Sequence, residues 1–108
     1  LEHVLGPDHP STLASRNNLA SAYKAAGDLS RALPLYEQAL ADLEHVLGPD
    51  HPSTLASRNN LASAYKAAGD LSRALPLYEQ ALADSIRILG ERHPTTQAIQ
   101  GNLHSFER

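Results

Sequence analysis

Serine, histidine and aspartate, the residue types of hydrolytic active sites, stand together in a short segment that recurs along the chain. The segment reads PDHPS at residues 7–11 and 49–53, and a diverged form, ERHPT, follows at 91–95. In hydrolases the nucleophile, the base and the orienting acid converge from separate parts of the fold. Within one turn the same residue types suit helix capping instead, so we expect the protein not to be an enzyme.

The histidines of this segment, His9, His51 and His93, are also candidate metal ligands. Transition metals need several ligands close together, whereas these imidazoles are each a whole repeat apart. We therefore interpret the histidines as helix starts and expect neither a metal site nor a cofactor. The chain has no cysteine, which excludes disulfides and thiolate chemistry and fits a reducing cytoplasm.

A second set of polar residues, rich in asparagine, recurs at a fixed spacing. An asparagine amide offers both a donor and an acceptor, so a row of them can pair with the backbone of an extended peptide. Lysine or arginine recurs beside them and favours acidic or carboxylate-ending ligands. The candidate peptide-binding residues are Asn17, Asn18, Ser21, Lys24, Asn59, Asn60, Ser63, Lys66, Asn102, Ser105 and Arg108. The alternative, that they are ordinary solvated helix surface, stays open.

Both sets owe their spacing to an internal repeat of 42 residues. Residues 1–42 and 43–84 are identical, and 85–108 is a diverged beginning of a third copy. A period of this length is typical of solenoids, whose units bury apolar surface only against neighbouring units. We therefore predict a single repeat array over residues 1–108. Identical copies indicate an array that was recently duplicated or designed.

Each copy predicts two helices. Pro10 near a first turn and Gly27 after an apolar stripe bound the first helix, and Asp28 and Gly48 bound the second. Pro34 lies inside the second helix and cannot donate to the carbonyl four residues earlier, so we expect a bend or a tight first turn there. The five predicted helices of this all-α chain span residues 10–26, 28–47, 52–68, 70–89 and 94–107.

The ends of the array differ from its middle. Residues 1–5 match 43–47, the last residues of a predicted helix, so we interpret them as the tail of a truncated helix. The apolar side of the helix at 10–26 would then lack an upstream neighbour, which favours weak self-association. Near the other end Gln97, His104 and Glu107 replace Leu, Ala and Tyr, which predicts a polar cap. The missing initial Met indicates a piece cut from a larger protein.

Composition excludes two classes of partner. With 9 basic and 12 acidic residues the net charge is −3, whereas nucleic-acid binding needs a clustered positive surface. No run of residues approaches the roughly 18 apolar positions of a membrane-spanning helix. We therefore expect neither nucleic-acid binding nor a membrane span.

The string NNLASAYKAAGDLSRALPLYEQAL, at 17–40 and again at 59–82, resembles the core of a tetratricopeptide repeat. Two departures are Arg16, where the family usually has Trp, and the period of 42 residues in place of 34. The longer period, with LGPDHP and NNLA, is similar to the kinesin light chain branch and to repeat tails of bacterial signalling ATPases. A phosphate-binding loop of the ATPase type does not occur in this chain. The residues of the first copy that match the tetratricopeptide repeat pattern are Leu19, Ala20, Tyr23, Gly27, Asp28, Ala32, Tyr36, Ala39 and Leu40.

The resemblance implies a right-handed superhelical solenoid of antiparallel helix pairs. In such a solenoid the first helix of each pair lines a concave groove, and asparagines there contact peptide backbone. The function it implies is a non-catalytic protein–protein interaction scaffold that binds an extended peptide or partner segment. The alternative is a structural or self-associating repeat segment without a peptide ligand, cut from a larger signalling protein.

Overall fold

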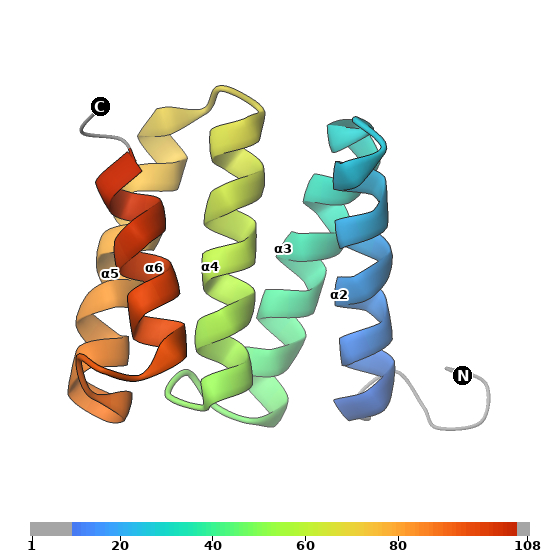
Figure 1. The fold of residues 1–108 in the computed structure, drawn as a ribbon. Coiled ribbons are helices and arrows are strands. Elements are labelled where there is room, and N and C mark those ends of the chain that lie inside the picture. Colours follow the sequence, from blue (N-terminus) through green and yellow to red (C-terminus); the bar gives the residue numbers. More distant parts are fainter. Residues whose placement is uncertain (1–9, 106–108) are drawn as a thin grey trace.

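The computed structural model describes residues 10–105, with side chains described from residue 15 onward. Within this part the chain forms five α-helices and no strand (Figure 1). Helices α2, α4 and α6 form one layer, and α3 and α5 form the other. The five predicted helices are confirmed with ends that differ by at most one residue, except that α6 ends at His104 and its predicted end at 107 lies outside the described residues. The predicted tail at residues 1–5 also lies outside them. The helices are α2 (Pro10–Ala25), α3 (Leu29–Val46), α4 (Pro52–Ala67), α5 (Leu71–Leu89) and α6 (Pro94–His104).

The histidines and aspartates of the repeat start its helices. The Nδ1 atom of His51 accepts a hydrogen bond from the backbone N–H of Ser53 at 3.0 Å, and His93 caps α6 in the same way. Asp28 and Asp70 are the N-caps of α3 and α5, and each accepts from the backbone N–H three residues later. These caps satisfy donors that the first helical turn leaves open. The helix-start interpretation of the two described histidines is therefore confirmed.

The turn after α3 requires glycine, because Gly48 has a φ of +92°. This left-handed conformation strains other residues, and it reverses the chain between α3 and α4.

The prolines inside α3 and α5 do not end their helices. Helices α3 and α5 each continue through their proline, Pro34 or Pro76, as single helices, while the predicted bend or tight first turn stays a prediction.

The two helices of a pair approach closely because alanine lies at their contacts. Two large side chains, Tyr36 and Tyr78, then fill the remaining space and are almost completely buried. Small residues let backbones come together while dispersion contacts stay dense. The fully buried alanines are Ala20, Ala32, Ala39, Ala62, Ala64, Ala74 and Ala81.

Helices α2 and α4 have the same sequence but different surroundings. Leu61 on α4 is 5% exposed because α3 packs against it, whereas Leu19 on α2 is 49% exposed. Likewise Ala64 is buried and Ala22 is exposed. The predicted exposed apolar side of α2 is thus confirmed at the residues described, while its role in self-association stays a prediction.

The last helix carries polar residues where the earlier copies are apolar. Gln97 and His104 are exposed, while Leu55 and Ala62 at the equivalent positions of α4 are fully buried. The predicted polar surface is confirmed for these two residues, and Glu107 lies outside the described residues. Ile99 faces the other way and is fully buried, so it holds α6 on the array. Between residues 10 and 105, every helix is too short or too polar to span a bilayer.

The matched leucines of α2 and α4 give a direct test of this arrangement. Leu61→Ala should lower the free energy of unfolding by about 2–4 kcal/mol, because it leaves a cavity between α3 and α4. Leu19→Ala should cost less than about 1 kcal/mol, because half of that side chain is already in water. Urea denaturation followed by circular dichroism at low protein concentration measures both. Equal losses would show that the outer side of α2 is covered in solution.

Candidate functional site

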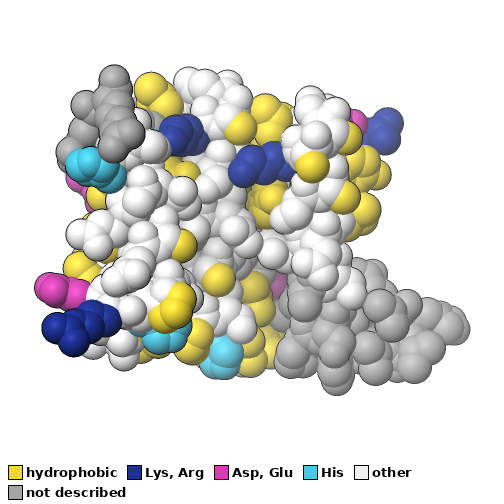
Figure 2. All heavy atoms as spheres, viewed as in Figure 1, with side chains coloured by type: hydrophobic (Ala, Val, Ile, Leu, Met, Phe, Trp, Pro, Cys, Tyr) yellow, Lys and Arg dark blue, Asp and Glu magenta, His cyan; other side chains and the backbone are white. Residues whose placement is uncertain are grey.

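Ten of the predicted binding residues lie on α2, α4 and α6 or directly after α6. Figure 2 shows the face that these three helices form, which is mostly uncharged and carries basic side chains towards the end where α2 and α4 finish. The three helices contain no Asp or Glu, and their Lys and Arg residues are Arg16, Lys24, Arg58 and Lys66. Predicted residue Arg108 lies outside the described residues.

The asparagines do not all lie free on this face. Asn18 is exposed, whereas Asn60 and Asn102 are half-buried. The amide Nδ2 of Asn102 donates to Oδ1 of Asn59 at 3.2 Å and so links α6 to α4. On α2 the Oδ1 atom of Asn17 is buried without a hydrogen-bond partner in the described part of the chain. The asparagine row therefore combines contacts between repeats with amides that remain open to a ligand.

The serines mainly connect helices. The hydroxyl of Ser21 lies 2.8 Å from that of Tyr36, and Ser63 and Tyr78 repeat the contact at 2.7 Å. Because each pair joins the two helices of one repeat, Ser21 and Ser63 orient buried tyrosines. Ser105 donates to the carbonyl of the asparagine that precedes it by three residues. A hydroxyl has further acceptor capacity, so the serines can still take part in binding as secondary contacts.

The lysines lie where α2 and α4 end. Lys24 and Lys66 are in the last turns of their helices, a position that favours positive charge near the helix carboxyl end. Lys66 also donates to the hydroxyl of Ser105. Amides and hydroxyls beside a basic end can bind a peptide backbone and an anion. In residues 10–105 no cluster of three or more His, Cys, Asp or Glu side chains could hold a metal ion.

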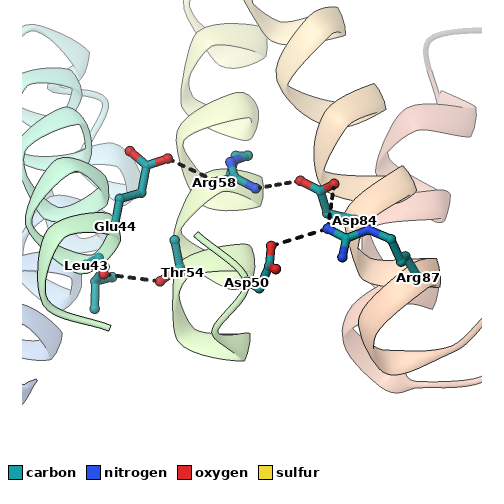
Figure 3. Close-up of polar contacts among 7 residues, drawn as sticks. All are labelled: Leu43, Glu44, Asp50, Thr54, Arg58, Asp84 and Arg87. Atoms are coloured by element: carbon teal, nitrogen blue, oxygen red, sulfur yellow. Dashed lines mark hydrogen bonds and ion pairs between the residues drawn. The ribbon is translucent and has the colours of Figure 1, made fainter. Parts of the chain in front are cut away.

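The sequence reasoning missed the role of the arginine that replaces the family's Trp. Arg58 is 2% exposed, and its guanidinium binds Glu44 of α3 at 3.0 Å and Asp84 of α5 at 3.2 Å (Figure 3). Arg87 extends the chain of charges by contacting Asp84 at 3.4 Å and Asp50 of the α3–α4 turn at 3.3 Å. Arg58 thus ties together one helix of the first repeat and two of the second.

A signal for this cluster was present in the sequence. At the junction of α5 and α6 the positions of Glu44 and Arg58 hold Ile86 and Gln100. Both charges are lost together in the third copy, as expected for two residues that contact each other. A buried guanidinium that loses one of its carboxylates is costly, so we expect the two positions to change as a pair.

Comparison with known proteins agrees with this architecture. The profile of the family described as tetratricopeptide repeat matches residues 1–45 and 31–85. The chain belongs to the tetratricopeptide repeat family. None of the curated proteins compared with the chain matches it.

Two solved structures are similar to this member of the family. One is a Podosopora anserina protein assigned as a kinesin light chain with nearly identical TPR-like repeats. Its TM-score is 0.87 at 41% identity, over 95% of this chain and 49% of that chain. A single-site variant of the Podosopora anserina protein gives a TM-score of 0.78 at 42% identity, over 91% and 46%. The chain thus spans about half the length of these solved repeat arrays. The predicted kinesin-light-chain-like repeat type is confirmed, whereas the bacterial ATPase context stays a prediction.

The paired charges predict strong coupling between Glu44 and Arg58. Glu44→Ile alone should destabilise the protein, because it leaves the buried guanidinium with fewer partners. Adding Arg58→Gln, as in the third copy, should recover part of that loss, giving a coupling energy of at least about 1 kcal/mol. Urea denaturation of the wild type, both single variants and the double variant measures the cycle. Additive effects would contradict a specific role for the pair.

Proposed function

We propose that this protein is a non-catalytic scaffold that binds an extended segment of a partner protein on the face formed by α2, α4 and α6. Tetratricopeptide repeats are generally scaffolds for protein–protein interactions. The proposal that a peptide binds on this face rests on the chemistry of the face. The three helices carry a row of asparagine amides and basic residues but no acidic residue.

The arrangement of the amides favours a peptide backbone as the ligand. Asn18 and Asn60 occupy the same position in successive repeats, so they can pair with successive parts of one extended strand. Each amide supplies one donor group and one acceptor, which matches the alternating N–H and C=O groups of a peptide. The Oδ1 atom of Asn17 is buried without a hydrogen-bond partner among the described residues, and it becomes an additional acceptor for the ligand once side chains on the face rearrange.

The charge of the face favours an acidic partner. Lys24 and Lys66 are supplied by two successive repeats, and nearby carboxylates of a ligand would form charge-assisted hydrogen bonds with them. A cytoplasmic location fits the absence of cysteine in the sequence.

The second candidate function is self-association through α2, which rests on the 49% exposure of Leu19.

Removing two amides from the face tests the proposal. The double variant Asn18→Ala/Asn60→Ala should weaken an extended acidic peptide selected from a library at least about tenfold, because two backbone pairings of about 0.5–1.5 kcal/mol each are lost. Its melting temperature should change little, because Asn18 is exposed and Asn60 is only half-buried. Isothermal titration calorimetry with this peptide gives both affinities.

The matched control is Gln38→Ala/Gln80→Ala, which removes two exposed amides from α3 and α5 of the same repeats. The control should bind the peptide like the wild type. If both double variants bind equally well and melt normally, the asparagine row is ordinary helix surface and the proposed face is wrong.

A further inference from the structure

A groove lies between α3 and α5, on the opposite layer from the asparagine row. Both helices pack on α4, and the space between them has a volume of about 450 Å³. Ligand sites in proteins have volumes of about 300–1,000 Å³ and are lined mainly by apolar side chains with a few polar groups. The lining residues are Glu37, Leu40, Ala41, Glu44, Leu61, Tyr65, Ser72, Arg73, Pro76 and Leu77.

The groove has an apolar interior that can receive a side chain. Leu40 and Leu61 are nearly buried, and Leu77 is half-buried. Pro76 adds a rigid apolar wall on α5, and Ala41 is exposed on the α3 side. An aliphatic side chain entering here would lose contact with water against five apolar residues, which favours binding.

The polar groups along the groove are mainly acceptors. Glu37 and Glu44 are exposed carboxylates seven residues apart on α3, and they therefore lie about two turns apart on one side of the helix. Opposite them, Pro76 has no N–H and cannot donate to the carbonyl of Ser72 four residues earlier. Two carboxylates and this backbone carbonyl are complementary to a cation and to peptide N–H groups.

The basic and phenolic groups of the lining are already engaged. Tyr65 donates from its hydroxyl to Glu37, and burial together with this hydrogen bond raises the pKa of Tyr65, which keeps it a donor. The guanidinium of Arg73 lies 5.7 Å from the centre of the Tyr65 ring and pairs with Asp70 at 3.4 Å. Arg73 stays largely exposed but is paired with Asp70, and the buried Arg58 is shared between Glu44 and Asp84. Together with Glu37 these carboxylates outnumber the two guanidinium groups, so negative charge remains in excess around the groove.

We propose that this groove is a second peptide-binding site, specific for a partner segment in which an aliphatic side chain is flanked by Lys or Arg. The aliphatic side chain enters between α3 and α5. The flanking cations meet Glu37 and Glu44, and a backbone N–H of the segment donates to the carbonyl of Ser72. The ligand class is opposite in charge to the acidic segment proposed for the asparagine row, so the two sites do not compete.

The repeat provides matched controls for this site. The groove needs α3 of the first repeat together with α4 and α5 of the second. Residues Ala83 and Glu79 on α5 correspond to Ala41 and Glu37 and are also exposed. No helix within residues 10–105 follows α6 to complete a second groove of this kind. Substitutions at these two α5 positions therefore change the same residue types outside the groove.

The test uses three capped pentapeptides, with the sequences Ala-Arg-Leu-Arg-Ala, Ala-Arg-Ala-Arg-Ala and Ala-Glu-Leu-Glu-Ala. Each is titrated into the isotope-labelled full chain, and backbone amide shifts are followed by NMR. The Arg-Leu-Arg peptide should shift the amides of Ala41, Leu61 and Leu77 and bind at least about tenfold more tightly than the other two, a difference of about 1.4 kcal/mol. Equal binding of all three, stronger binding of the acidic peptide, or no shifts up to about 5 mM would overturn the proposal.

Variants then locate the binding. Ala41→Trp should abolish the shifts because the indole fills the groove, while Ala83→Trp should leave them unchanged. Glu37→Gln should weaken the Arg-Leu-Arg peptide about two- to fivefold, as expected for a solvent-exposed ion pair, and Glu79→Gln should not. Circular dichroism checks that each variant is folded. The proposal fails if Ala41→Trp and Ala83→Trp bind the peptide alike, or if the shifts map to the asparagine row.

Discussion

The array depends on how closely two helices can approach at their alanine contacts. Ala20 and Ala32 in the first repeat, and Ala62 and Ala74 in the second, are fully buried, so no side chain there keeps the backbones apart. This approach leaves room for one large residue per pair, Tyr36 or Tyr78, whose hydroxyl reaches a serine on the partner helix. A larger residue at any of these alanines would separate the helices and break that hydrogen bond. The repeat can therefore be densely packed although it contains few aromatic residues.

Identical sequences acquire different roles in this array because their neighbours differ. Leu19 and Leu61 are the same residue in the same helix sequence, yet one is half exposed and the other is buried. Stability in such a chain is the sum of what each repeat contributes and what each junction contributes. The junction between α3 and α4 includes the ion pair of Arg58 with Glu44, whereas the junction between α5 and α6 has Ile86 and Gln100 at these two positions. The two junctions are therefore chemically distinct, although the helices that form them are nearly the same.

Much of the fold could be predicted from local signals in the sequence. Caps such as Asp28 and His51 and turns such as Gly48 act within a few residues, and the period of the chain reveals that these elements stack. The candidate site was harder to predict, since it depends on contacts between helices and between repeats. The contact of Ser21 with Tyr36 joins two helices of one repeat, 15 positions apart, and that of Asn102 with Asn59 joins two repeats, 43 positions apart. Neither contact leaves a local pattern, because serine and asparagine are also common on solvated helices.

Among the described helices, acidic residues occur in only one of the two layers, and this distribution has a structural consequence. Helices α2, α4 and α6 contain no acidic residue. In the other layer, α3 carries three, Glu37, Asp42 and Glu44. Two of these carboxylates face arginines that come from helices of the other layer, as in the pairs of Arg16 with Asp42 and of Arg58 with Glu44. The arginine side chains are thereby drawn into the interior, so the positive charge left at the surface of their layer is that of lysines near the helix ends. The exposed carboxylates remain on α3, beside the groove that it forms with α5. Attraction between the layers thus stabilises the stack and leaves one face without acidic residues, while the other carries carboxylates together with Arg31, Arg73 and Arg87.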